Sequence, residues 1–85
     1  MPKQDLILLA LQPSPILDLM QRTLHAAGYD VAVAHDRPGL DKSMLEAIPA
    51  LMIIGERFAD QDGFIVSNGM LERFPTLPII FYAGK

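Results

Sequence analysis

Carboxylates have the clearest chemical potential in this 85-residue sequence, and three of them follow one apolar run. Glu56, Asp60 and Asp62 come shortly after Leu51–Ile54. Paired carboxylates can bind a divalent cation or share a proton. We favour a structural interpretation, because Asp is a preferred turn and N-cap residue and a glycine follows at once. Asp60 and Asp62 are therefore expected to shape a turn and cap a helix, and Glu56 to form a solvated pair with Arg57.

The two histidines do not have the spacing of metal ligands. The residue four places after His25 is Tyr29, a poor ligand for a divalent metal, and His35 stands alone at the end of a predicted strand. The sequence contains no cysteine, which excludes thiolate, disulfide and iron–sulfur chemistry. No glycine-rich turn follows the first apolar run, so a nucleotide-binding loop is not expected. We predict a domain with no catalytic residue, no metal and no cofactor.

Composition fits one small domain with ample apolar surface. Hydrophobic residues make up 51% of the sequence, the net charge is −3 and the mean hydropathy is +0.26. The mild acidity argues against a nucleic-acid or anionic-membrane partner. No apolar run approaches the roughly 20 residues of a transmembrane helix, and the first residues lack the pattern of a signal peptide. A cytoplasmic location is expected.

Apolar runs and helix signals alternate along the chain. We predict strands over 6–11, 29–34, 51–54 and 78–82, and helices over 15–27, 37–48 and 64–74. Uninterrupted apolar strands are typical of a parallel sheet that is covered by helices on both faces. The order strand, helix, strand predicts an α/β fold with right-handed crossovers.

Local signals define the ends and the inner faces of the predicted helices. Ser14 is a good N-cap for the first helix, Gly28 supplies a left-handed stop, and Asp36 caps the second helix. The residues expected to face inward are Ile16, Met20, Leu24 and Ala27 on the first helix, and Leu40, Met44 and Leu45 on the second.

Four segments together resemble the receiver domain of two-component response regulators: Gly28–Val31, Ala50–Ile54, Asp60–Phe64 and Arg73–Phe81. The combination of the Asp-Gly-Phe turn with the later Phe-Pro-Thr-Leu-Pro-Ile-Ile run is the most specific part. The resemblance covers essentially the whole chain. It implies a flavodoxin-like (CheY-like) doubly wound parallel sheet in strand order 2-1-3-4. Receivers continue through a further helix, strand and helix, so residues 1–85 are expected to form a partial receiver-like domain without the fifth strand.

The resemblance also implies that the family's phosphorylation site is missing. Leu11, Gln12 and Pro13 stand across the positions of the acidic pair that binds magnesium in the family. The phosphate-accepting aspartate of the family matches Gly55, and the hydroxyl residue that senses the phosphoryl group matches Ala83. The resemblance therefore predicts a degenerate receiver, or pseudo-receiver, that is no enzyme and acts as a regulatory module for a protein partner or effector domain.

Two other functions stay open at this level. A flavodoxin-like domain could bind a small ligand in the depression left at the missing phosphorylation site. An unconventional phospho-acceptor using Glu56 or Asp60 would instead be enzyme-like. A shaped apolar pocket would favour the first of these, and a phosphorylated product the second.

Apolar residues that do not fit one small core are candidates for contacts with a partner. They are Ile65 and Leu71 on the charge-poor third helix, Leu17 and Leu19 on the first helix, and Ile79, Ile80 and Phe81 on the fourth strand. In the strand order above, the fourth strand forms an open apolar edge that would pair with any strand it meets. We therefore expect a homo-oligomer rather than a stable lone monomer.

Overall fold

The structure is a computed structural model that describes residues 5–58 and 61–82. Its helices are α1 (Pro15–Ala26), α2 (Arg37–Glu46) and α3 (Gly63–Arg73). Its strands are β1 (Leu6–Ala10), β2 (Asp30–Ala34), β3 (Leu51–Gly55), β4 (Arg57–Phe58), β5 (Gln61–Asp62) and β6 (Ile79–Tyr82). The three helices and the four longer strands all lie where the sequence predicts them, with ends that differ by at most two residues.

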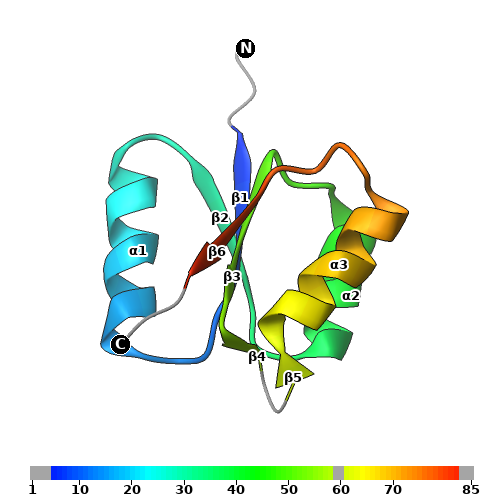
Figure 1. Cartoon of the computed structure of the whole chain (residues 1–85). Coiled ribbons are helices and arrows are strands. Elements are labelled where there is room, and N and C mark those ends of the chain that lie inside the picture. The colour runs from blue at the N-terminus through cyan, green and yellow to red at the C-terminus, as the bar shows by residue number, and fades with distance from the viewer. Residues whose placement is uncertain (1–4, 59–60, 83–85) are drawn as a thin grey trace.

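The four longer strands form one parallel sheet in the order β2-β1-β3-β6. Because β6 is the fourth of these strands along the chain, the predicted order and the α/β fold class are confirmed. Helix α1 covers one face of the sheet, and α2 and α3 cover the other (Figure 1). All four strands run in the same direction, so their carboxyl ends lie at one edge of the sheet.

The two faces of the sheet carry separate apolar clusters. Side chains alternate along a strand, so neighbouring residues of β1 enter opposite clusters and the strand is buried on both faces. The cluster beneath α2 and α3 consists of Leu8, Ala10, Ala34, Leu40, Met44, Met52, Ile54, Phe58, Val66, Met70 and Leu77. The cluster beneath α1 consists of Ile7, Leu9, Leu11 and Leu17, with Met20, Leu24, Val31, Val33, Leu51, Ile53 and Tyr82 partly buried against it.

On α1, Met20 and Leu24 face inward as predicted, but Leu17 takes the inward position predicted for Ile16. Ile16 is 42% exposed, whereas Leu17 is only 3% exposed and packs into the cluster beneath α1. Both Ile16 and Leu17 have a helical spacing to Met20 and Leu24, and the packing of α1 on the sheet selects Leu17. The prediction that Leu17 contacts a partner is therefore wrong, and so is the inward placement of Ile16. Ala27, also predicted to face inward, is exposed and lies beyond the helix as its C-cap.

On α2 the prediction for Leu45 is also wrong, because this side chain is 83% exposed. Leu40 and Met44 are four residues apart and share the buried face, and Leu45 lies a further 100° or so around the helix. The predicted caps are confirmed. The Ser14 and Asp36 side chains accept hydrogen bonds from the amides of Leu17 and Gly39, and Gly28 has a φ of +97°.

Strands β4 and β5 replace part of the predicted turn before α3. Arg57 pairs with Asp62, and Phe58 pairs with Gln61, in a short antiparallel ladder. The ladder places the Phe58 ring in the core with no exposed surface. Asp62 also caps α3 as predicted, since its carboxylate accepts a hydrogen bond of 2.8 Å from the Phe64 amide.

A contact between two glycines seats α3 against the end of β3. A Cβ atom at Gly63 would collide with the carbonyl oxygen of Gly55. The Gly63 amide also donates a 2.9 Å hydrogen bond to the carbonyl oxygen of Glu56. Only a residue without a side chain can therefore stand at the first position of α3.

The loops after β1 and β2 are joined by a pair of hydrogen bonds that we call the Gln12–His35 clasp. The Gln12 side-chain amide donates to the carbonyl oxygen of His35 over 3.0 Å. The His35 Nδ1 lies 3.0 Å from the carbonyl oxygen of Leu11, which can only accept, so this nitrogen carries the proton. The clasp holds the two loops together at the carboxyl edge of the sheet.

The glycine contact predicts opposite effects of one substitution at two sites in α3. Gly63→Ala should lower the free energy of unfolding by about 1 to 3 kcal/mol, because the new methyl group overfills a backbone contact. Gly69→Ala should raise it by about 0.5 to 1 kcal/mol, since nothing lies near that Cβ position and Ala favours a helix. Urea unfolding followed by circular dichroism measures both. Equal effects at the two positions would contradict this account.

The clasp predicts that the two histidines differ in their contribution to stability. His35→Ala should lower the free energy of unfolding by about 0.5 to 1.5 kcal/mol, because it removes one partly buried hydrogen bond. His25→Ala is the matched control. Its side chain is exposed on α1, so its effect should stay within about 0.5 kcal/mol. A His35→Ala variant as stable as the control in urea would show that the clasp contributes nothing.

Candidate functional site

A small hollow lies at the carboxyl edge of the sheet, where a doubly wound fold places its ligands. Its volume is about 230 Å³. Its lining residues are Leu11, Gln12, Ser14, Ile16, Gly55, Glu56, Arg57 and Tyr82. The structure thus brings together Leu11, Gln12, Gly55 and Glu56 as the sequence predicts, while Pro13 is exposed in the loop beside them and does not line the hollow. Ala83 and Asp60 lie outside the described residues.

The inner wall of this hollow is apolar. Gly55 is buried, and a Cβ atom at this position would lie 3.0 Å from Leu11 Cδ2 and 3.6 Å from the carbonyl oxygen of Arg57. Leu11 itself is 5% exposed and belongs to the cluster beneath α1. A side chain at position 55 would therefore press on Leu11, which would have to move by a few tenths of an ångström.

Polar groups around the hollow are either used elsewhere or exposed. The Gln12 amide group is held by His35 in the Gln12–His35 clasp. Glu56 and Arg57 are exposed and form no ion pair in the described part of the chain, so the predicted pair between them is wrong. Asp62 is committed to the N-cap of α3.

Within residues 5–58 and 61–82, no three acidic or histidine side chains gather as a metal site would require. In the same residues, no helix is long and apolar enough to cross a membrane. Of the carboxylates that the sequence analysis considered for metal binding, Glu56 and Asp62 are described by the structure. They lie near one loop without forming a cluster.

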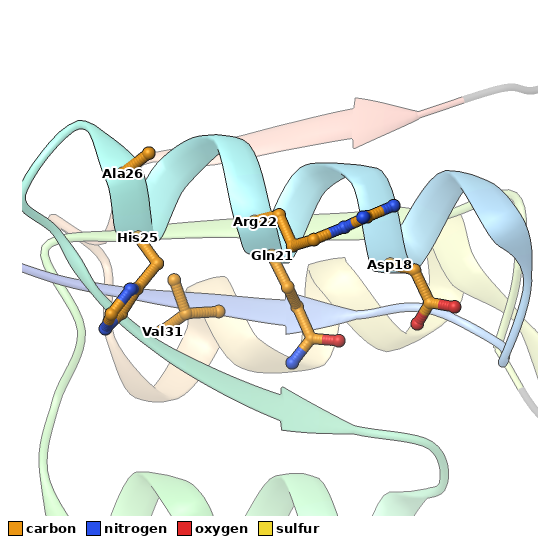
Figure 2. Close-up of a pocket in the computed structure, with 6 residues that line it drawn as sticks. All are labelled: Asp18, Gln21, Arg22, His25, Ala26 and Val31. Carbon is orange, nitrogen blue, oxygen red and sulfur yellow. The ribbon is translucent and has the colours of Figure 1, made fainter.

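A larger open groove of about 740 Å³ runs along α1, beside β2 rather than at the carboxyl edge. Figure 2 shows the six residues that line it: Asp18, Gln21, Arg22, His25, Ala26 and Val31. Sequence analysis did not single out this groove. The sequence does contain a pattern that indicates it. Asp18 and Arg22 are four residues apart, as are Gln21 and His25, and this spacing places the four polar side chains on one side of α1.

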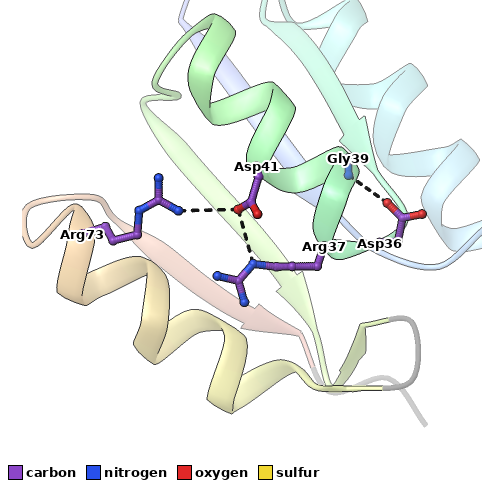
Figure 3. Close-up of polar contacts among 5 residues, drawn as sticks. All are labelled: Asp36, Arg37, Gly39, Asp41 and Arg73. Atoms are coloured by element: carbon purple, nitrogen blue, oxygen red, sulfur yellow. Dashed lines mark hydrogen bonds and ion pairs between the residues drawn. The ribbon is translucent and has the colours of Figure 1, made fainter.

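Ion pairs in the described residues centre on Asp41 in α2. Its Oδ1 lies 3.3 Å from Nε of Arg37 in the same helix and 3.6 Å from Nη1 of Arg73 in α3 (Figure 3). All three side chains are more than a third exposed, so the pairs orient α2 and α3 and stabilise the fold only weakly.

Several predicted contact residues are exposed as expected. Ile65 on α3 is 68% exposed, and Leu71 on the same helix and Leu19 on α1 are exposed too. On β6, Ile80 and Phe81 are exposed, but Ile79 is partly buried against the cluster beneath α2 and α3.

Phe64 was missed as a surface residue. It is exposed at the start of α3, and its ring packs edge-on against Phe81 with 6.2 Å between centroids. An apolar surface therefore continues from α3 onto β6. A sequence signal existed, since Val66 and Met70 are four residues apart on one face of α3, and Phe64 lies about 200° from Val66 around the helix.

Comparison with known proteins identifies the fold. No protein-family model and no curated protein sequence matches the chain. The solution NMR structure of the REC domain of the Erythrobacter litoralis PhyR response regulator is similar, with a TM-score of 0.75 at 20% sequence identity. The match covers 94% of this chain and 63% of that one, so this chain spans less than two thirds of the PhyR domain. The described residues thus have the α/β, flavodoxin-like fold of a receiver domain.

Proposed function

We propose that residues 1–85 form part of a receiver-type module that regulates signal transduction. We also propose that phosphorylation does not switch this module. The observation that carries the proposal is the carboxyl end of β3. There the buried Gly55 lies against Leu11. In the receiver domains that this chain resembles, the matching position holds the phosphate-accepting aspartate. An acyl phosphate needs a carboxylate at this point.

The residues next to Gly55 support the same proposal. Magnesium prefers anionic oxygen ligands, and the positions that match the family's acidic pair hold Leu11, Gln12 and Pro13. Leu11 is buried in the core, and the Gln12 side chain is bonded to the His35 carbonyl oxygen. A pseudo-receiver that acts as a binding module, without catalysis of its own, fits this chemistry best.

Small-ligand binding is the weaker alternative. The hollow at the carboxyl edge has about 230 Å³, whereas pockets for drug-sized ligands usually hold about 300 to 1,000 Å³. The groove along α1 is larger, but it is open and lined mostly by polar side chains of one helix. Neither hollow has the enclosed apolar lining of a ligand pocket, so we place the function on the surface of the domain.

The proposed partner is a protein or an effector domain, and the cytoplasm is the proposed location. Phe64 and Ile65 give α3 an exposed apolar surface that contains no charged residue before Glu72. Charged residues are depleted at the centre of protein interfaces, and aromatic residues are enriched there. The acidic composition does not favour nucleic acid or an anionic membrane as the partner.

Incubation with a small-molecule phosphodonor and magnesium should leave the intact mass of the protein unchanged. Calorimetry should detect no stoichiometric magnesium binding, because no anionic ligands stand at the matching positions. The Gly55→Asp variant should also stay unmodified, since it restores one carboxylate without the metal pair and crowds Leu11.

A receiver domain that retains its aspartate and acidic pair serves as the positive control in both assays. An added phosphoryl mass on the wild-type chain would overturn the proposal and direct attention to the enzyme-like alternative at Glu56 or Asp60. Tight one-to-one magnesium binding would overturn it as well.

A further inference from the structure

We propose that two copies of this chain pair edge to edge through their β2 strands, antiparallel and about a two-fold axis at Ala32. This pairing goes beyond the proposed function, because it assigns a second copy to one surface, and it does not depend on the phosphorylation site. Strand β2 is the outermost strand of the described sheet, next to β1. It is also outermost in the flavodoxin-like order 2-1-3-4-5, in which the fifth strand joins the opposite side of the sheet, beyond β6.

Backbone groups on the outer side of β2 are arranged for a further strand. The Asp30 amide donates a 3.0 Å hydrogen bond to the Asp5 carbonyl oxygen, and β2 pairs in parallel with β1 over its whole length. In a parallel strand the N–H and C=O groups of one residue point to the same side, and those of the next residue point to the other. Alternate residues from Asp30 onward therefore face β1. Val31 and Val33 direct two N–H and two C=O groups outward.

Side chains on β2 leave room for a second strand. Edge strands usually carry charged residues or proline that prevent pairing. Here the charge is confined to Asp30 at the first position, and the next four residues are small and apolar. Val31 and Val33 pack against the cluster beneath α1, and Ala32 packs against the cluster on the other face. A second copy of β2 would extend both clusters without covering a charged group.

Two-fold symmetry restricts the register of this pairing. Residues directly opposite each other in an antiparallel pair point to the same face, and a two-fold axis perpendicular to the sheet keeps the two faces of each copy aligned. The axis must therefore pass through a residue position. With the axis at Ala32, Val31 lies opposite Val33 of the second copy. All the outward backbone groups of both valines are then used.

Hydrogen bonds at the two ends of β2 exclude the shifted registers. A register shifted toward either end of the strand would oppose a valine to Tyr29 or to His35. The Tyr29 N–H already donates to the Leu24 carbonyl oxygen, and the His35 carbonyl oxygen already accepts from Gln12. Only the register centred on Ala32 pairs groups that are directed outward and not bonded in this way.

Charges on α1 are complementary to their own copies in this arrangement. Asp18, Gln21, Arg22 and His25 line the open groove beside β2, and Figure 2 shows Gln21 and Arg22 between Asp18 and His25 along the helix. The two-fold axis places the α1 helices of the two copies side by side and antiparallel. Because α1 carries a carboxylate at one end of this row and basic groups toward the other, Asp18 of each copy comes opposite His25 of the other copy. Opposite charges thus meet on both sides of the axis.

Single cysteines test the register, because the natural chain contains none. In the proposed register the two Ala32 Cα atoms form a non-hydrogen-bonded pair about 4.5 Å apart, within the usual range for a disulfide. The two Val33 Cα atoms would be about 8 Å apart, which is too far. Ala32→Cys should therefore form a disulfide-linked dimer under mild oxidation, and Val33→Cys should not.

The exposed residue Leu45 on α2 provides the control for random collision, as Leu45→Cys. Equal crosslinking of Leu45→Cys and Ala32→Cys would overturn the proposal. Crosslinking of Val33→Cys in preference to Ala32→Cys would overturn the register. Circular dichroism of each variant establishes that it is folded before oxidation.

Sedimentation of Val31→Pro supplies the second measurement. Proline removes the outward N–H of this residue and leaves the hydrogen bonds between β2 and β1 in place, since it is tolerated on an edge strand. Wild type should form a dimer, and folded Val31→Pro should associate about tenfold or more weakly, because each copy loses one hydrogen bond to the other. A folded wild-type monomer at every concentration would overturn the proposal. A folded Val31→Pro variant that associates as tightly as wild type would overturn it too.

A charge exchange tests the alignment of the two α1 helices. His25→Glu should weaken association by about threefold or more, because two carboxylates would then face each other at each end. The double variant Asp18→Lys with His25→Glu should recover the lost affinity, since it restores opposite charges. A double variant as weak as His25→Glu would overturn this alignment. The phosphodonor assay has an independent readout, so a failure of the dimer leaves the proposed function standing, and the converse also holds.

Discussion

The close approach of α3 to the end of β3 is the constraint on which the carboxyl edge of this domain depends. Gly63 opens α3 directly against the Gly55 carbonyl oxygen, where any side chain would collide. That contact sets the height of α3 above the sheet, and Val66 and Met70 on its inner face then pack into the cluster beneath α2 and α3. The missing side chain of Gly63 thus lets α3 begin against the backbone of β3.

Other residues at this edge limit what it can do chemically. In doubly wound folds, the crevice outside the strand ends is where ligands bind. Here the hollow is small, its inner wall is Gly55 and Leu11, and the nearby amide group of Gln12 is tied to the loop after β2. Apolar packing at Gly55 and Leu11 and the hydrogen-bonded clasp at Gln12 thus shape this edge. Interaction surfaces therefore become the more informative part of the molecule.

One of these surfaces lies around β6. Among the described residues, α2 and α3 cover one face of the sheet and α1 covers the other (Figure 1). Phe64 and Phe81 are in contact at the surface on the first side, and Ile80 is exposed on the second. Within the described sheet, β6 therefore carries exposed apolar side chains on both faces.

Sequence alone determined the order of elements, their parallel arrangement, the three helix caps and the absence of a carboxylate at position 55. These features follow from local chemistry: unbroken apolar runs, Ser14, Asp36 and Asp62 as caps, and Gly28 with its left-handed φ. Tertiary structure decided the rest. It buried Leu17 in place of Ile16, exposed Leu45, placed Phe58 in the core through the β4–β5 ladder, and joined Gln12 to His35. Each of these depends on how a helix is rotated against the sheet or on contacts between residues distant in the chain, and neither is encoded in local spacing.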